Sequence, residues 1–295
     1  MEEVNIKKYY SEFSFLRNLD DEEQIEIFNS SIGKSEIFKV GRCVFYYSYL
    51  AWDSNFFGLN TIRINFIDCP ADFLINDDLR EFEDFCKINF GLQYVFIEIP
   101  SEHIDLIQNL NLNNFRLIET RLHYYNDFTN GFTPGERFNV RAASNCDIDN
   151  LRSVAARMRN IYDRFHADRI FDVKIADAFL AKYIENAING FADLVIVPNA
   201  LNCQSNSFLT AVYQDAIVKY NNLKCAKMVL SAVDAESNKG WYLKLISEMT
   251  IMLREKGFNV IHCNTQATNR AVIKVWTKLG YQYGRCTHIF SKKYD

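Results

Sequence analysis

The sequence is poor in the features that mark several large classes of protein. Its 295 residues include only 11 glycines and 4 prolines, and no stretch approaches the apolar length that spans a bilayer. The first residues, MEEVNIKKYYSEF, lack the basic segment and apolar core of a secretory signal. These absences predict a cytoplasmic protein with no membrane partner.

Paired cysteines and an excess of positive charge are missing too. The eight cysteines form no CxxC pair and no close group with histidine, so we expect reduced thiols and no metal site. The formal net charge of −4 argues against a nucleic-acid partner, because capture of a phosphate backbone needs a basic surface.

What the sequence does contain indicates two folded parts. With 48% hydrophobic and 24% charged residues, a chain of this length suggests two domains of ordinary size. Turn-forming residues gather in NDFTNGFTPGERFNV, residues 126–140. We therefore predict an N-terminal domain at 1–130, a linker at 131–138 and a C-terminal domain at 139–295.

Apolar patterns along both parts alternate between helical and strand periods. YVFIEI (94–99) is a predicted strand that follows an amphipathic helix ending at Gly91, and ADLVIVP, SFLTAVY and KMVLSAV are three more predicted strands. A helix predicted from about residue 241 ends near Gly257, and the strand NVIHCNTQ and the helix TNRAVIKVWTKLG follow it. This order predicts an α/β fold.

The most informative turn lies in SAVDAESNKGWYLKLI, where an apolar strand, a polar break and one glycine lead into a helix. Backbone N–H groups and the helix dipole favour a phosphate at such a turn. Gly240 permits close approach, Lys239 adds a charge, and Ser237 or Asn238 adds a donor. A simple capped connection is the alternative that one glycine leaves open.

A second motif, NTQATNRAVIKVWTKLGY, follows one strand later. Together the two motifs resemble the acetyl-CoA site of the GCN5-related N-acetyltransferase (GNAT) superfamily, over roughly the last 155 residues. The matching positions are Val233, Lys239, Gly240, Asn269, Val272, Trp276, Gly280 and Tyr281. A narrower resemblance, to the bacterial nucleotide-sugar N-acetyltransferases that include TDP-fucosamine acetyltransferase, rests on KGWYLKLI, NTQATN, DRFHAD and WDSNFFG.

The resemblance implies an α/β (α+β) GNAT fold, with a mixed, mostly antiparallel central sheet flanked by helices and a reduced GNAT-like domain at the N-terminus. It implies acetyl-CoA as the cofactor and no metal. The residues expected at the coenzyme are Ala232, Val233, Ser237, Asn238, Lys239, Gly240, Trp241, Tyr242, Asn269 and Trp276.

The implied reaction is direct attack of a neutral amine on the thioester. The backbone N–H near Val233 would polarise the carbonyl. Trp276 occupies the position of the family's acidic tyrosine, and it either positions the reacting groups or is a core aromatic, because an indole N–H does not give up its proton. His166 is the candidate base, with Asp168 orienting it, or else a surface histidine.

Recognition of a nucleotide sugar needs a stacking surface and cations. The residues expected there are Trp52, Phe56, Phe57, Arg164, His166, Asp168, Arg169 and Gln266, although the aromatics could equally join the two halves of the chain. The predicted function is N-acetylation of a nucleotide-linked amino-dideoxy sugar, with a dTDP-3-amino-3,6-dideoxyhexose favoured and a 4-amino sugar possible, by a monomer or homodimer, for O-antigen or capsule synthesis. A small-amine or protein N-acetyltransferase and a non-catalytic GNAT-like binding module are the alternatives.

Overall fold

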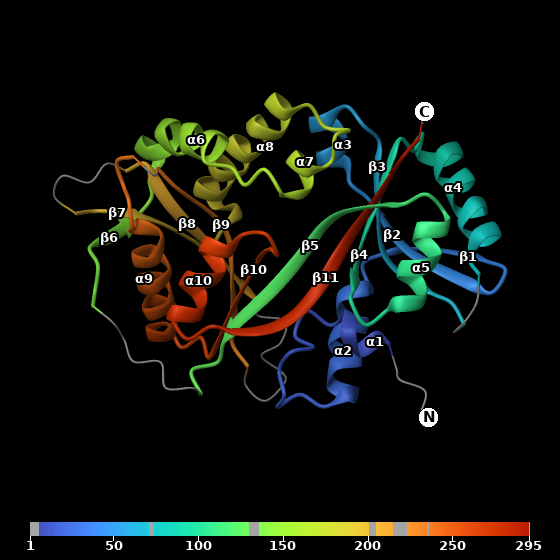
Figure 1. Cartoon of the computed structure of the whole chain (residues 1–295), viewed down its shortest axis with the longest axis horizontal. Coiled ribbons are helices and arrows are strands. Elements are labelled where there is room, and N and C mark those ends of the chain that lie inside the picture. The colour runs from blue at the N-terminus through green and yellow to red at the C-terminus, as the bar shows by residue number, and fades with distance from the viewer. Residues whose placement is uncertain are drawn as a thin grey trace. The chain divides into compact units, whose positions relative to one another are not determined.

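The structure is a computed structural model that describes residues 6–70, 74–129, 136–200, 205–214, 223–234 and 236–294. Backbone contacts divide the chain into two compact units, shown in one view in Figure 1. Unit 1 contains Met1–Arg121 together with Arg285–Asp295, and unit 2 contains Leu122–Gly284. The last strand of the chain, Gln282–Lys293, therefore begins in unit 2 and ends in unit 1. The strand Arg116–Asn126 begins in unit 1 and ends in unit 2.

The predicted linker lies partly outside the described residues, because 131–135 are not among them. Where the structure resumes, the Arg137 guanidinium contacts Glu248 at 2.8 Å, and the backbone N–H of Phe138 donates to the same carboxylate. The end of the connection is thus fixed on a helix of unit 2. The domain boundaries predicted from the sequence stay a prediction.

Unit 1 has two short N-terminal helices, a meander of three strands, and two α–β repeats. Its elements are α1 (Lys7–Tyr10), α2 (Asp21–Ile32), β1 (Glu36–Val40), β2 (Cys43–Tyr49), α3 (Ala51–Phe57), β3 (Thr61–Asp68), α4 (Asn76–Phe90), β4 (Tyr94–Pro100), α5 (Ile104–Leu112) and β5 (Arg116–Asn126), the last of which continues into unit 2. The predicted strand at 94–99 is confirmed, and α4 ends at Gly91, whose φ of 61° suits glycine.

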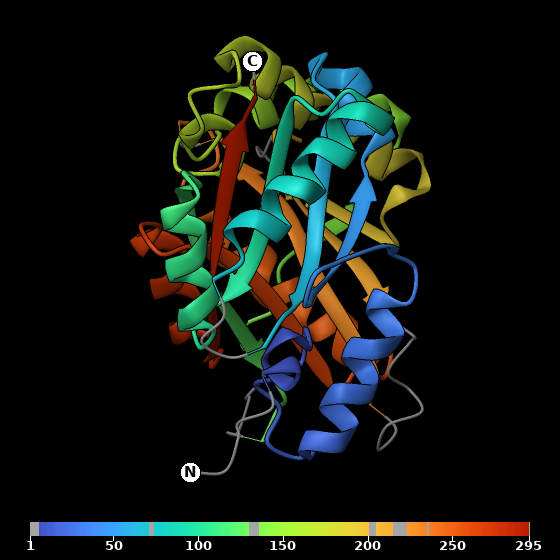
Figure 2. The same cartoon turned by 90° about the vertical axis from the view of Figure 1, so that its right-hand side faces the viewer.

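The strands of unit 1 follow the order β1-β2-β3-β4-β11, where β11 is Gln282–Lys293. β1, β2 and β3 are antiparallel, β3 and β4 are parallel, and β11 runs antiparallel to β4. The main core of the unit includes Phe45, Ile97 and Phe290 from the sheet and Phe82 and Leu110 from α4 and α5. Figure 2 shows these two helices over the strands.

Unit 2 repeats the strand meander and the two α–β steps after a group of helices. Its elements are β6 (Val140–Ala142), η1 (Asn145–Asp147), α6 (Ile148–Arg157), α7 (Arg164–Ala167), α8 (Val173–Asn186), η2 (Ala187–Phe191), β7 (Leu194–Pro198), β8 (Ser207–Gln214), β9 (Cys225–Val233), α9 (Trp241–Glu255), β10 (Val260–Gln266) and α10 (Arg270–Lys278). The helices and strands predicted in this half are confirmed.

The strand order in unit 2 is β5-β10-β9-β8-β7-β6. α9 and α10 pack on one face of this sheet, through a core that includes Leu245, Met249 and Trp276. α6 and α8 pack on the other through Leu151 and Ile184 (Figure 1). Apart from α3, both halves of the chain thus follow the order β-β-β-α-β-α-β, and the last strand of each half, β5 or β11, crosses between the units. The sheet is mixed and mostly antiparallel, as predicted.

Candidate active site

The parallel strands β9 and β10 pair over only four residues. Their register runs from Cys225 opposite Val260 to Met228 opposite Cys263. β9 then continues to Val233 and β10 to Gln266 with no further pairing between them. Because strands that stop pairing present unpaired backbone N–H and C=O groups, the carboxyl ends of β9 and β10 form a gap that can accept a polar ligand.

An irregularity between β9 and β8 occurs at the same level as the gap. The register shifts between Leu209 and Ala211, and the hydroxyl of Thr210 accepts the N–H of Leu230 at 2.9 Å and donates to its carbonyl at 3.2 Å. A bulge of this kind bends a strand. It gives a local reason for β9 to turn away from β10, and it places Ala232 and Val233 at the edge of the gap.

The turn that follows β9 is held by the carboxylate of Asp234. One oxygen accepts the N–H groups of Glu236 and Ser237 at 3.0 and 3.2 Å, and the other contacts Arg157 at 2.7 Å. The backbone N–H groups of the turn lower the pKa of Asp234, with a further contribution from Arg157. Asp234 therefore stays ionised and fixes the shape of the turn.

The side chains of Ser237 and Asn238 face β8 and connect the turn to that strand. Asn238 is 1% exposed, and its amide donates to Asn206 and to Ser207, while Asn206 donates to the hydroxyl of Ser237. The backbone N–H of Asn238 bonds Asp234. Asn238 thus positions the turn, and the predicted contact of its side chain with a coenzyme has no support in this geometry.

Gly240 is the N-cap of α9, with a φ of 85°, in the left-handed region that favours glycine. A Cβ placed there would meet no atom within 4 Å, so the space in front of the helix is open. In the described structure no side chain caps this helix and its first turn contains no acidic residue, while Lys239 beside it is exposed. Backbone donors, open space and a cation suit a phosphate.

Behind this turn, two aromatic side chains meet the splayed end of β9. The hydroxyl of Tyr242 on α9 faces the indole of Trp276 on α10 and the hydroxyl of Ser231 on β9. Burial raises the pKa of Tyr242, so that its phenol stays protonated. Trp276 is 3% exposed, and among the described residues its Nε1–H has no acceptor at hydrogen-bonding geometry. Trp241 is buried and belongs to the same core.

An unpaired buried N–H is costly, and it is commonly satisfied by water or a ligand. Trp276 is a core aromatic, which is one of the two interpretations of its sequence position. Its role in positioning the reacting groups stays a prediction.

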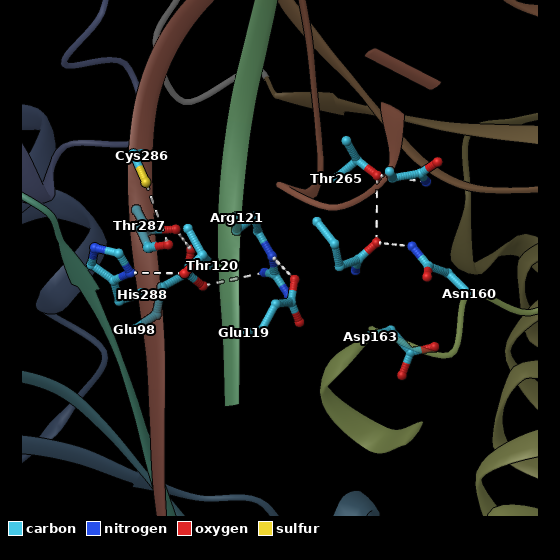
Figure 3. Close-up of polar contacts among 12 residues, drawn as sticks. Glu98, Glu119, Thr120, Arg121, Asn160, Asp163, Thr265, Cys286, Thr287 and His288 are labelled. Carbon is cyan, nitrogen blue, oxygen red and sulfur yellow. Dashed lines mark hydrogen bonds and ion pairs between the residues drawn. The ribbon is translucent and has the colours of Figure 1, made fainter. Parts of the chain in front are cut away.

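The end of β10 is connected to the loop between α6 and α7. The amide of Asn160 donates to the side chain of Gln266, Thr265 contacts the same oxygen at 3.4 Å, and Asn269 donates to Thr265 at 3.0 Å. Figure 3 draws these contacts around Asn160 and Thr265. Gln266 and Asn269, both predicted site residues, thus lie at the gap, and Asn160 is a residue that the sequence reasoning missed.

His166 lies on α7, where both ring nitrogens contact carboxylates. Nδ1 is 2.8 Å from Asp163 and Nε2 is 3.2 Å from Asp177, so the ring does not use Asp168 as predicted. Burial alone would lower the pKa of His166, but the two carboxylates outweigh it and raise the pKa. The side chain is 2% exposed.

Both carboxylates accept hydrogen bonds, and an imidazole that donates from both nitrogens is protonated. Such a ring has no lone pair to accept a proton from an amine. The arrangement around His166 therefore supports a buried charge cluster rather than the predicted base. Arg159, 3.0 Å from Asp177, belongs to this cluster.

The other predicted substrate residues occupy several places. Arg164 lies over the ring of Phe165 at 4.3 Å, Asp168 is 1% exposed and accepts the N–H of Ile170, and Arg169 is exposed.

In unit 1, Trp52 stacks on Phe56 with ring centroids 5.4 Å apart, and Phe56 meets Phe57 edge-on. Trp52 is 44% exposed, which makes this pair an aromatic surface on α3.

Unit 1 has a polar cluster of its own on β4, β5 and β11. Arg121 binds both oxygens of the fully buried Glu119 side chain and one oxygen of Glu98, whose other oxygen accepts the hydroxyl of Thr287 (Figure 3). His288 sits between the hydroxyls of Ser101 and Thr120 at 3.1 Å each, and burial lowers its pKa. These groups satisfy one another, so we assign the cluster to structure.

The residues that the sequence reasoning missed are those that act through partners distant in sequence. Asp177 lies eleven positions after His166 on another helix, and Asn160 reaches Gln266 across 106 positions. Asp163 could have been found from the sequence, because an aspartate just before a short helix is a typical N-cap. Its side chain does cap α7.

This combination of a mixed sheet, a parallel pair that separates at its end, and a glycine turn into the next helix is the fold of the GNAT acetyltransferases. Structural comparison supports that fold. A GCN5-related N-acetyltransferase from Sphaerobacter thermophilus aligns over 93% of this chain and 85% of its own, with a TM-score of 0.55 and 11% identity. A conserved protein of unknown function from Staphylococcus epidermidis aligns over 89% and 95%, with a TM-score of 0.56 and 13% identity.

N-myristoyltransferase from Saccharomyces cerevisiae, solved with bound myristoyl-CoA, is also similar, with a TM-score of 0.50 and 14% identity over 92% of this chain and 70% of its own. No protein-family model matches the sequence, and no curated protein matches it. At these identities the comparisons show the fold. They do not choose a substrate.

Across the described residues, no helix is both long and apolar enough to cross a membrane. Within the same part of the chain, no group of three histidine, cysteine, aspartate or glutamate side chains is placed to hold a metal ion.

Proposed function

We propose that the protein is an N-acetyltransferase that moves an acetyl group from acetyl-CoA to an amine at the gap of unit 2. The observation that carries the proposal is the meeting of the separated strands β9 and β10 with the open, glycine-capped start of α9, in a chain with a GNAT fold. Neither feature alone would define a site.

The residues of this gap fit a coenzyme A molecule. Its diphosphate would lie against the N–H groups at the start of α9, with Gly240 giving access and Lys239 adding charge. Ala232 and Val233 offer strand backbone along the separated edge, and Asn269 lies at the facing end of β10. When bound, the coenzyme supplies an acyl group activated as a thioester.

The protein's part in the reaction is to polarise the acyl carbonyl and to position the sulfur. A backbone N–H near Val233 would donate to the carbonyl oxygen as negative charge develops on it. The buried Trp276 N–H and the neighbouring Tyr242 hydroxyl are donors for the sulfur. Because Trp276 cannot give up its proton, protonation of the leaving group falls to water.

The amine must arrive neutral or lose its proton at the site. His166 is unsuited to take that proton while it donates to Asp163 and Asp177. We therefore assign deprotonation to solvent, and His166 to support of the helices beside the gap.

For the acceptor we propose a nucleotide-linked amino-dideoxy sugar, with a dTDP-3-amino-3,6-dideoxyhexose first and the 4-amino sugars second. The support is the resemblance of KGWYLKLI, NTQATN, DRFHAD and WDSNFFG to sugar acetyltransferases, and in unit 2 the exposed Arg169 offers a cation for a diphosphate. The associated proposals are a cytoplasmic enzyme, monomeric or homodimeric, that acts in O-antigen or capsule synthesis.

An acceptor screen tests this assignment. The full-length protein is incubated with acetyl-CoA and dTDP-amino sugars, UDP-amino sugars, small amines or peptide amines, and thiol release and acetylated product are both measured. Turnover of the dTDP-amino sugars above all others is expected. Turnover of peptides or small amines alone would replace the sugar with that acceptor, and saturable binding of acetyl-CoA without turnover would favour a binding module.

A further inference from the structure

Unit 1 contains a second parallel pair that separates, like the one in unit 2. β3 and β4 pair over four residues, from Thr61 opposite Tyr94 to Ile64 opposite Ile97. β3 then continues to Asp68 and β4 to Pro100 without pairing each other. By fold alone, the chain would therefore have two equivalent gaps for an acyl donor.

The N-terminal segment of the chain contacts the ends of both strands of this pair. The ring of Tyr10 packs edge-on against Phe66 of β3 with centroids 4.7 Å apart, and Lys7 contacts Asp68 at the end of β3 at 2.8 Å. The Tyr10 hydroxyl reaches Nδ1 of His103, which follows β4, at 2.8 Å. Helix α1 thus bridges the gap.

Further contacts hold this segment in place. Arg285, at the start of the part of β11 that belongs to unit 1, donates to the carbonyls of Tyr9 and Ser11 at 3.1 and 2.7 Å. Phe28 of α2 contacts both Phe66 and Tyr10. Burial lowers the pKa of His103 to about 4, which keeps its ring neutral beside the Tyr10 hydroxyl.

The helix start in unit 1 is also unsuited to an anion. The N-cap of α4 is Ile75, which is fully buried and has a negative φ, whereas the N-cap of α9 is Gly240. The first turn of α4 contains Asp77 and Asp78, which would repel a phosphate. The side chain of Asn109 already accepts the N–H of Ile75.

From these contacts we infer that the N-terminal segment closes the gap of unit 1, so that the chain binds one acyl donor, in unit 2, despite its two copies of the strand arrangement. The inference rests on the proposed function for the number of donors bound. The closure itself can be tested without any donor.

Calorimetric titration of the full chain with acetyl-CoA tests the number of sites. The wild type is expected to bind one molecule of acetyl-CoA per chain. The Gly240→Val variant is expected to have no site with the dissociation constant of the wild type. Two molecules per chain, or a full-strength site that survives Gly240→Val, would overturn the inference. Absence of any binding to the wild type would instead remove the proposed function, and the next measurement would then decide the closure.

Thermal unfolding of Tyr10→Ala tests the closure independently. A side chain that fills the gap predicts a melting temperature lower by about 5 °C or more, because its removal leaves a cavity beside Phe66. Tyr9→Ala is the matched control, since it keeps the carbonyl that Arg285 binds and removes a ring whose one described contact is Lys8. Equal melting temperatures for the wild type and Tyr10→Ala would contradict a closed gap.

Discussion

The two units share one strand arrangement but differ in the side chains that surround it. Each contains a parallel pair of strands that separates after four residues. In unit 1 the chain's own Tyr10 and Lys7 bridge the separated ends, and the next helix follows the buried Ile75 and has two aspartates in its first turn. In unit 2 the next helix follows an open glycine and has no acidic residue in its first turn. The side chains around a shared backbone arrangement therefore decide whether it can be a binding site.

The largest expected effect comes from giving unit 2 a blocked helix start. Gly240→Val should raise the KM for acetyl-CoA about tenfold or more, because the side chain fills the approach to the backbone donors and the left-handed φ becomes strained. Initial rates against acetyl-CoA concentration measure this.

Gly257→Val is the matched control for that variant. Gly257 lies at the other end of α9 with a φ of 87°, and a Cβ there also meets nothing within 4 Å. Both variants should lose similar stability, since the backbone strain is similar, but only Gly240→Val should change KM. Equal KM values in the two variants would remove the phosphate assignment.

The next effect concerns the buried indole N–H of Trp276 in unit 2. Trp276→Phe should lower kcat about fivefold to tenfold because it removes this donor, and it should lower the melting temperature by about 2 to 5 °C because the smaller ring leaves a cavity in the core. Steady-state kinetics and thermal unfolding measure the two quantities. Leu253→Ala is the control on α9, because it removes a fully buried side chain of the same core near the end of the helix that is distant from Gly240. Loss of stability without loss of turnover in Trp276→Phe would make it a core residue alone.

A smaller effect is expected at the charge cluster beside the gap. The pKa of His166 is raised in the folded protein, so its stabilising effect is complete below its unfolded value near 6.5 and is lost as pH rises through the folded value. The stability advantage of the wild type over His166→Asn should therefore shrink as the pH rises above about 6.5. Urea unfolding at several pH values measures it. An advantage that grows with pH, or a base-type ionisation lost from the pH–rate profile of the variant, would restore the catalytic role.

The smallest effect belongs to Lys239, an exposed cation beside the turn. Lys239→Ala should raise the KM for acetyl-CoA about twofold to threefold at low salt, with the difference fading at high salt because exposed charges are screened. Kinetics at two ionic strengths measure it. A salt-independent change would mean that Lys239 acts through the fold of the turn.

The sequence allowed prediction of the fold and of the turn, because both depend on local patterns. Periodicity located the strands and helices of the second half, and one glycine after an apolar strand located the start of α9. The closure of unit 1 could not be predicted, since it needs Tyr10 to meet His103 across 93 positions. Asp177, one of the two partners of His166, was missed for the same reason, because proximity in sequence suggested Asp168 and the fold supplied Asp177. Asn238 resembled a ligand donor in sequence, yet packing turned its amide toward β8.

Amide hydrogen exchange with and without coenzyme A compares the two units most directly, because one experiment measures the protection of the helix starts of both α4 and α9. The account predicts protection on binding at the end of β9 and at residues 239–243, with no change at the end of β3 or at the start of α4. Protection at β3 and α4, or binding that leaves residues 239–243 unprotected, would contradict it.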